Sequence, residues 1–162
     1  MEYLYAPWRH DYFQEKQSKE CIFCRISGEA LDEHNKVFYR DDKIFCVMNK
    51  YPYSPGHFLI IPHFHTNSPE KLQEDVWLHL QKYARKGIGV LKEFGAKGIN
   101  MGMNIESVGG AGIPEHIHLH LIPRFFGDTN FITTIGESRV YGTDFEEVYL
   151  RIKTLWKKHL GI

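Results

Sequence analysis

The stretch that decides the fold is EHIHLHLIPRF, residues 115–125, in which three histidines alternate with large apolar residues. His116, His118 and His120 stand two positions apart. Successive side chains on a β-strand point to opposite faces, so a strand would gather the imidazoles on one face, about 7 Å apart. The apolar residues between them would then enter a core. Because a helix would scatter the imidazoles around its axis, the alternation predicts a strand.

Three interpretations of the aligned histidines are open. They are the polar face of a half-exposed strand, a transition-metal site, or a site that handles phosphate. Imidazole is a common metal ligand, but it also attacks phosphorus, protonates leaving oxygens and hydrogen-bonds phosphate oxygens. The glycine-rich segment SVGGAGIP, residues 107–114, directly precedes the histidines and lets backbone amides approach an anion closely. This neighbour favours phosphate.

Composition limits the class of protein. The 162 residues are enough for one domain, and 20 Lys and Arg balance 20 Asp and Glu, so no strong field attracts nucleic acid or an anionic membrane. No apolar run approaches the roughly 20 residues that cross a bilayer, and the N-terminus lacks the features of a secretory signal. Three cysteines, two of them in Cys21-x-x-Cys24, are typical of a reducing compartment and of a metal site. We therefore expect a cytoplasmic protein without nucleic-acid or membrane partners.

The remaining sequence predicts an α+β domain with a mostly antiparallel sheet and two longer helices. Periodicity and turn residues predict these elements in order: a hairpin of 37–40 and 43–49, a turn at 50–56, a strand at 57–62, a helix start at Ser68-Pro69-Glu70, a helix over 75–94, strands at 98–104 and 116–123, and a last helix. A capping box, Thr143 to Glu146, is expected to open that last helix, with Phe145, Val148, Ile152 and Leu155 on its apolar face.

The triad itself resembles a known motif. His116-Ile-His118-Leu-His120-Leu-Ile122 is similar to the histidine triad sequence, and on it the chain is identified as a member of the histidine triad (HIT) superfamily of nucleotide hydrolases and transferases. The segments CIFCRI (21–26), VMNKYPYSPGHFLIIPHFH (47–65) and NIESVGGAGIPEHIHLHLIPRF (104–125) also resemble HIT segments, in the family's order. LYAPWRHDYF (4–13) and GDTNFITTIGESRVY (127–141) resemble the branch of diadenosine tetraphosphate (Ap4A) phosphorylases and Fhit-like dinucleoside polyphosphate hydrolases.

The resemblance implies a HIT-like fold and an architecture. It implies one HIT domain over residues 1–162, with an N-terminal extension (1–20), a core (21–126) and a C-terminal tail and helix (127–162). It also implies a homodimer in which the two sheets join across subunits. Trp8, Phe125, Phe126 and Tyr141 are aromatic candidates for base stacking or dimer contacts.

The resemblance also implies catalytic roles for four histidines. His118 would be the nucleophile that attacks the α-phosphorus and forms a nucleotidyl-histidine intermediate. The backbone carbonyl of His116 would accept the ring N–H of His118, and His120 would bind the α-phosphate oxygens. His57, in Pro55-Gly56-His57, would be a fourth histidine beside the triad. Water or inorganic phosphate would then release the nucleotide.

Nucleotide-binding residues follow from the same resemblance. Asn49 matches the position that holds the ribose hydroxyls, although a turn-forming asparagine is the alternative. Asn104, Gly110 and Gly112 are expected to bind phosphate. The chain departs from the family pattern at two places: Glu106 replaces a glycine, and Gly112 replaces a glutamine or serine. Glu106 is expected to point outward, and backbone amides are expected to bind phosphate at position 112 in place of a side chain. Arg124 either reaches a distal phosphate or is exposed to solvent.

A second constellation suggests zinc. Two thiols three residues apart can chelate one ion, although they can also simply pack in the core. The resemblance adds two histidines to Cys21 and Cys24, namely His65 and His116, and so implies a closed structural zinc site. His63 would then be free of the metal. Cys46 is expected in the core. His10, His34, His79 and His159 are expected at surface or packing positions.

The predicted function is therefore an enzyme, a nucleotide hydrolase or nucleotidyltransferase. It would cleave a dinucleoside polyphosphate such as Ap4A at the α-phosphate, by hydrolysis or phosphorolysis. Two alternatives stay open: a nucleoside phosphoramidase of the Hint type, and a nucleotide-binding sensor with slow turnover. A metal held by all three triad histidines is a further rival.

Overall fold

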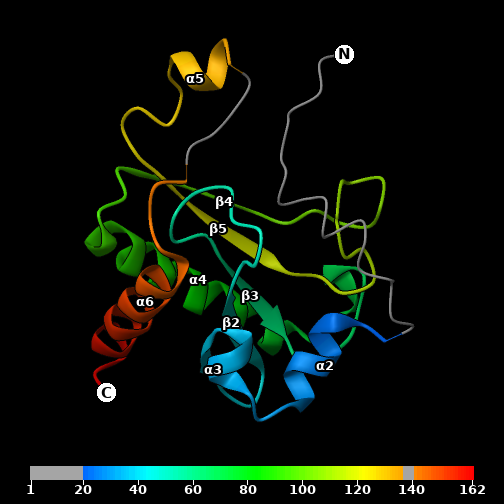
Figure 1. Cartoon of the computed structure of the whole chain (residues 1–162). Coiled ribbons are helices and arrows are strands. Elements are labelled where there is room, and N and C mark those ends of the chain that lie inside the picture. The colour runs from blue at the N-terminus through cyan, green and yellow to red at the C-terminus, as the bar shows by residue number, and fades with distance from the viewer. Residues whose placement is uncertain (1–19, 137–140) are drawn as a thin grey trace.

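The computed structural model describes residues 20–136 and 141–162. The similar segment at 4–13, with Trp8 and His10, lies outside the described residues, as do residues 137–140 of the segment at 127–141. Figure 1 shows a central sheet with helices on both of its faces. Among the described residues, no helix has the length and apolar character needed to cross a membrane.

The sheet has five strands, and every neighbouring pair is antiparallel, as predicted. Their spatial order is β1-β2-β3-β5-β4. The strands are β1 (Val37–Arg40), β2 (Ile44–Met48), β3 (Phe58–Pro62), β4 (Gly98–Gly102) and β5 (Leu119–Arg124). The histidine-bearing strand therefore lies between β3 and the edge strand β4.

Two long helices cover one face of the sheet, as predicted. They are α4 (Glu74–Phe94) and α6 (Phe145–Leu160), and α4 contacts β3, β5 and α6. Gly87 allows the close approach of α4, because a Cβ there would lie 2.7 Å from Leu121 Cδ2 and 2.8 Å from Phe58 Cζ. The glycine that weakens the helix by sequence propensity is thus required by packing against the sheet.

The opposite face carries the short helix α2 (Ile22–Gly28), followed by α3 (Asp32–Asn35). Alternate residues of β2 and β3 enter two separate cores, so the sheet is buried on both faces. The α2 side contains Phe23, Ile26, Val37, Phe45, Val47, Leu59 and Ile61, which we call the α2 core. Leu59 pairs with His120 across the strands, which places the histidine on the α2 side.

Two helix starts differ from the predictions. Ser68 precedes a single 3-10 turn, η1 (Pro69–Lys71), and its side chain caps nothing; α4 begins separately at residue 74. The last helix is capped by Asp144, which accepts from the backbone N–H of Glu147 at 2.9 Å, and not by Thr143. The start one residue later follows from the core: the helix buries Val148, Tyr149, Ile152 and Trp156, whereas Phe145 and Leu155 are only partly buried.

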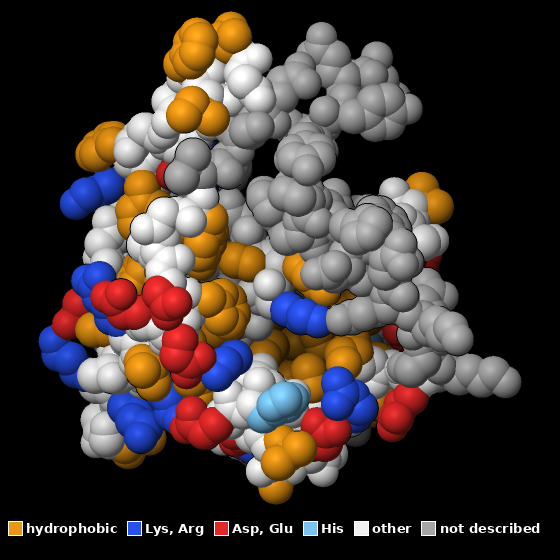
Figure 2. Space-filling view, viewed as in Figure 1, with side chains coloured by type: hydrophobic (Ala, Val, Ile, Leu, Met, Phe, Trp, Pro, Cys, Tyr) orange, Lys and Arg blue, Asp and Glu red, His pale blue; other side chains and the backbone are white. Residues whose placement is uncertain are grey.

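The one remaining short helix among the described residues is α5 (Phe131–Thr134), whose N-cap Asn130 accepts from the backbone N–H of Thr133. Figure 1 shows α5 projecting away from the sheet. Its apolar residues are exposed, as Figure 2 shows at the top of the view, with Phe131, Ile132 and Ile135 between 44% and 73% accessible.

Candidate active site and metal centre

Only one of the three triad histidines lies in a strand. Strand β5 begins one residue after His118, so His120 is inside it while His116 and His118 precede it. The prediction of a strand from residue 116 is wrong for its first three residues. There the backbone N–H of Ile117 donates to the carbonyl of Thr66 at 2.8 Å and does not join the sheet. All three histidines are nevertheless buried, with 0%, 4% and 8% of their surface exposed.

Burial keeps these imidazoles neutral. It lowers the pKa of His57 to about 3, with added repulsion from His120 and His118. Burial also lowers the pKa of His120 and of His116 to about 4 each, and it lowers the pKa of His118. A neutral ring carries one proton, so the partner of either nitrogen fixes the tautomer.

Backbone carbonyls fix the tautomers of His116 and His118, since a carbonyl can only accept a hydrogen bond. The Nδ1 of His118 lies 2.8 Å from the carbonyl oxygen of His116, so Nδ1 carries the proton and Nε2 keeps its lone pair. This is the contact that the resemblance implied. The Nε2 of His116 lies 2.9 Å from the carbonyl oxygen of Pro62, so in His116 the lone pair is on Nδ1.

A backbone amide fixes the tautomers of His57 and His120. The N–H of Tyr53 donates to His57 Nδ1 at 3.1 Å, so the proton of His57 is on Nε2. That Nε2–H donates to His120 Nδ1 at 3.0 Å, which leaves the proton of His120 on Nε2. The Nε2–H of His120 is buried and has no partner among the described residues. Such an orphaned donor is costly unless a ligand accepts from it.

The four predicted metal ligands come together. One donor atom from each of Cys21, Cys24, His65 and His116 lies within 4.8 Å of every other. The sulfur–nitrogen distances are 3.1, 3.5 and 3.6 Å, and the two Nδ1 atoms are 3.3 Å apart. A tetrahedral zinc ion, with bonds of about 2.3 Å to sulfur and about 2.0 Å to nitrogen, separates its ligand atoms by about 3.3–3.8 Å. The donor set therefore fits zinc.

The surroundings of this cluster also suit a metal. His116 directs its lone pair at the cluster because its other nitrogen donates to a carbonyl, the usual arrangement of a metal-bound histidine. Burial and the neighbouring Cys21 raise the pKa of the Cys24 thiol to about 11, so an ion would have to displace its proton. All three cysteines are free thiols, and Cys46 lies in the core as expected.

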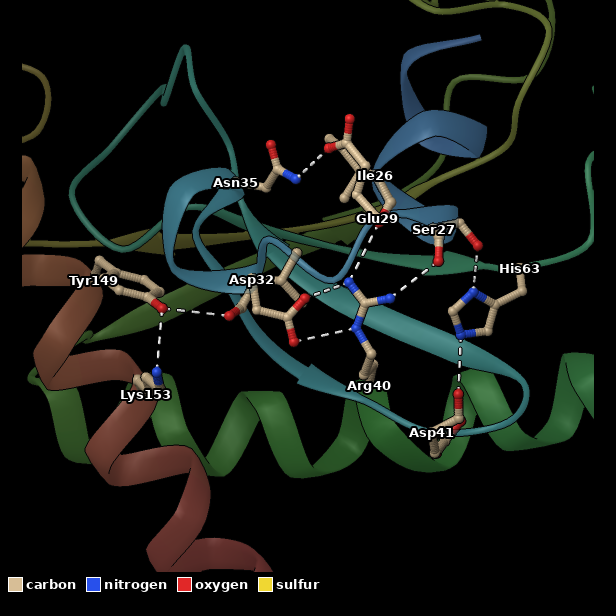
Figure 3. A network of polar contacts seen from close by, with 11 residues as sticks. Ile26, Ser27, Glu29, Asp32, Asn35, Arg40, Asp41, His63, Tyr149 and Lys153 are labelled. Atoms are coloured by element: carbon tan, nitrogen blue, oxygen red, sulfur yellow. Dashed lines mark hydrogen bonds and ion pairs between the residues drawn. The ribbon is translucent and has the colours of Figure 1, made fainter.

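His63 lies outside the group of four candidate metal ligands, as expected, and its ring makes two other hydrogen bonds. Its Nε2–H donates to the carbonyl of Asp41 at 2.9 Å, so Nδ1 accepts from the Ser27 hydroxyl at 2.6 Å. Figure 3 shows this bridge between the end of α2 and the β1–β2 turn. The sequence offered no signal for it, because Ser27 and His63 are 36 residues apart.

Asn49 lies beside the histidines but is engaged within the protein. Its Oδ1 accepts from the N–H of Tyr51 at 3.0 Å, and its Nδ2 lies 3.3 Å from both ring nitrogens of His57. The asparagine thus shapes the turn, which was the alternative interpretation, and it also lies next to the site. Its ribose contact stays a prediction.

Two residues with positive φ, Glu106 and Gly110, shape the glycine-rich loop before the histidines. Asn104 donates to the carbonyl of Gly110 at 3.4 Å, and Gly110 has φ +88°. Glu106 has φ +60°, a conformation that favours the glycine of the family pattern. Its side chain is exposed and accepts from Asn67 at 3.3 Å, so it points outward as expected. The phosphate contacts expected of Asn104, Gly110 and Gly112 stay predictions.

The outlying candidates have local roles. Arg124 pairs with Asp128 at 2.7 Å and donates to Asn100 at 3.0 Å, so its side chain is held at the end of β5. Phe125 packs against Phe94, whereas Phe126 is 89% exposed. His79 pairs with Asp41, and His159 pairs with Glu93. Tyr141 is partly buried, and His34 is exposed.

Comparison with known proteins agrees with the geometry. The HIT domain family matches residues 31–127 of the chain. The chain belongs to the HIT family. Over 98% of its length it is 30% identical to a Mycobacterium tuberculosis protein named AP-4-A phosphorylase, covering 86% of that protein.

Two further proteins are similar to this chain, one in fold and one in sequence. A crystal structure of a zinc-bound histidine triad protein from Mycobacterium smegmatis superposes with a TM-score of 0.70, at 24% identity, covering 86% of this chain and 94% of that one. An adenosine 5'-monophosphoramidase of Danio rerio is 29% identical, covering 70% of this chain and 71% of that protein. The predictions of a HIT-like fold and of an enzyme of this family are therefore confirmed.

Proposed function

We propose that this HIT protein cleaves dinucleoside polyphosphates, of which Ap4A is the example, at the α-phosphate through a nucleotidyl-His118 intermediate. One observation carries the proposal: His118 Nε2 has a lone pair, and the N–H on His120 Nε2 has no partner among the described residues. The two rings are neighbours, with centroids 4.8 Å apart. A nucleophile beside a buried donor is suited to attack a phosphorus whose oxygens accept that donor's hydrogen bond.

The tautomers define what each ring does. His118 Nε2 forms a bond to the α-phosphorus, and the bond from phosphorus to the bridging oxygen breaks with its electron pair on the leaving phosphate. The ring of His118 is then cationic, and its Nδ1–H donates more strongly to the carbonyl of His116. His120 Nε2–H donates to a non-bridging oxygen as charge grows there. Water or inorganic phosphate then displaces His118 from phosphorus and restores the neutral ring.

His57 acts through His120. Its Nε2–H donates to His120 Nδ1 and so keeps the proton of His120 on the nitrogen that is free for phosphate. In the other tautomer, His120 would present a lone pair to an anion and repel it. Asn49 is proposed for the ribose hydroxyls, and Asn104 with the amides of Gly110 and Gly112 for the phosphates.

We propose zinc as a structural cofactor held by Cys21, Cys24, His65 and His116. The proposal rests on the fit of the four donor atoms, and it is supported by the zinc-bound relative. A closed four-ligand ion supplies folding energy and leaves no position for substrate, so zinc on all three triad histidines is not part of this proposal. The free thiols suit a reducing compartment, for which we propose the cytoplasm.

We further propose a single HIT domain over residues 1–162 that forms a homodimer joined at β4. This edge strand has β5 as its neighbour in the described sheet, and Met101 on it is 48% exposed. Edge strands with free backbone groups are ready to pair with a second chain. The exposed apolar residues of α5 offer a surface, besides β4, that a second subunit could bury (Figure 2).

Product analysis tests the substrate class. The protein is incubated with dinucleoside polyphosphates of two to five bridging phosphates, with and without inorganic phosphate. Hydrolysis releases AMP from Ap4A, whereas phosphorolysis releases ADP only when phosphate is added. The His118→Ala variant, checked for folding, should lose nearly all turnover. Near-full activity of a folded His118→Ala variant would refute the nucleophile.

A phosphoramidase is the second candidate, because the same two rings would serve it and the Danio rerio relative carries that name. Comparing turnover of Ap4A with turnover of adenosine phosphoramidate separates the two enzymes. A nucleotide sensor would instead bind, nucleotidylate His118 and release it slowly, so a modified protein would persist after the substrate is removed.

A further inference from the structure

We propose that Phe23 is a positioning residue that couples the Cys/His metal cluster to the ring of His118. The inference rests on the proposed function, since it explains how the nucleophile of that reaction is held. Phe23 stands between the two thiol ligands in the sequence Cys21-Ile-Phe23-Cys24. It is 4% exposed.

The ring of Phe23 contacts two triad histidines. Its centroid lies 5.7 Å from the His116 ring at an interplanar angle of 87°, and 5.1 Å from the His118 ring at 58°. These are edge-on and tilted contacts of the kind that aromatic rings prefer. The element that supplies two metal ligands therefore also supplies one wall beside the nucleophile.

The hydrogen bond of His118 alone does not fix its ring. The bond from Nδ1 to the carbonyl of His116 holds one ring atom and still allows the ring to pivot about it. Phe23 packs on that ring and limits the pivot. The position of His118 Nε2 therefore depends on where α2 holds Phe23.

The far end of α2 is held without a metal. Arg40 donates to the carbonyls of Ser27 at 3.0 Å and Ile26 at 3.3 Å, and it pairs with Asp32. The hydroxyl of Ser27 also bonds to His63. Figure 3 shows these contacts gathered around Arg40 and the end of α2.

The two ends of α2 would respond differently to loss of the metal. Loss of the metal would free the first turn of α2, where Phe23 lies, while the Arg40 contacts keep the rest of the helix in place. His116 links the cluster to the nucleophile by a second route, because it is a proposed metal ligand and its carbonyl holds His118. The metal cluster thus orders the nucleophile without touching the substrate.

Two matched variants test the role of Phe23. Phe23→Leu removes the ring beside His118. Phe45→Leu makes the same change elsewhere in the α2 core, where the Phe45 ring lies beside His63, with the two ring centroids 5.4 Å apart. Should Phe23→Leu fail to fold, Phe23→Met replaces it with a side chain of closer volume. The readouts are kcat and KM on the dinucleoside polyphosphate panel, and the nitrogen-15 shifts of the His118 ring.

The expected result separates geometry from binding. Phe23→Leu should lower kcat by about tenfold or more with KM nearly unchanged, because small misplacements of a nucleophile are costly. The His118 shifts should move from a single Nδ1–H tautomer toward an average of both tautomers. Phe45→Leu should leave kcat and the His118 shifts as in the wild type. An unchanged kcat with unchanged shifts in Phe23→Leu, or equal losses in both variants, would overturn the proposal.

Zinc removal gives an arm that is independent of turnover. Treating the wild-type, zinc-loaded protein with a chelator should shift the His118 ring signals in the same direction as Phe23→Leu does, and adding zinc back should restore them. If the His118 ring signals stay unchanged when zinc is removed, the proposed coupling is overturned. If the wild type turns over no nucleotide but its His118 signals respond as described, the proposed function fails and the positioning role stands.

Discussion

Acidification should destabilise this protein through its buried histidines, in a way that the structure quantifies. Burial lowers the pKa of His57 from 6.5 to about 3 and that of His120 from 6.5 to about 4. Below pH 6.5 the unfolded chain binds a proton at each position and the folded chain does not, so acid shifts the equilibrium toward unfolding. Above pH 6.5 both states are neutral there, and this effect disappears.

The magnitude follows from the linkage relation. On going from pH 7 to pH 5, each histidine whose folded pKa is 3 or 4 lowers the unfolding free energy of the protein by about 2 kcal/mol. His57 and His120 together should lower it by about 4 kcal/mol, a large part of the roughly 5–15 kcal/mol typical of a domain. The loss should begin near pH 6.5 and continue down to the folded pKa values.

Urea unfolding at pH 7, 6 and 5 measures this loss, with zinc present throughout. In a His57→Gln variant, the loss between pH 7 and pH 5 should be smaller by about 2 kcal/mol, because one of the buried titrating histidines is gone. The control His34→Gln changes an exposed histidine and should keep the full pH dependence. An unfolding free energy that is flat from pH 7 to pH 5, or a His57→Gln variant with the full slope, would refute the reasoning.

Three further substitutions test other parts of the structure. Glu106→Gly should raise the unfolding free energy by up to about 1 kcal/mol in thermal or urea unfolding, because Glu106 has φ +60°, and a lower stability would contradict this. Gly87→Ala should lower it by about 1–3 kcal/mol, since the new methyl group would press on Leu121 and Phe58; an unchanged stability would mean that α4 lies farther from the sheet. Cys24→Ser should reduce bound zinc, measured by elemental analysis, from about one ion per chain to a small fraction, and full retention would exclude this ligand set.

The fold was largely predictable because its signals are local. The hairpin of β1 and β2, strand β3 and the two long helices follow from alternation, helical periodicity and turn residues. The starts of helices were harder. Thr143 and Asp144 are both good caps, and only the packing of the last helix against the core selects the second.

The candidate site was predictable in membership but not in its detailed geometry. The motif indicates which histidines gather, yet His116 turns toward Cys21, Cys24 and His65 because the chain enters β5 only after His118. The tautomers of His57 and His120 depend on the backbone N–H of Tyr53, which any residue except proline supplies, so no residue type signals it. The contacts of Phe23 with the triad join positions more than 90 residues apart, and a single sequence does not show them.

Mass measurement of the intact chain, denatured rapidly at alkaline pH, tests the proposed covalent intermediate most directly. The protein is mixed with Ap4A, stopped within the first turnover under these conditions, which preserve a phosphorus–nitrogen bond, and digested to locate any adduct. We predict one nucleotidyl group on the wild-type chain, located on His118, and none on the His118→Ala variant. A wild-type enzyme that turns over Ap4A without such an adduct, or an adduct that persists in His118→Ala, would contradict the nucleophilic role of His118.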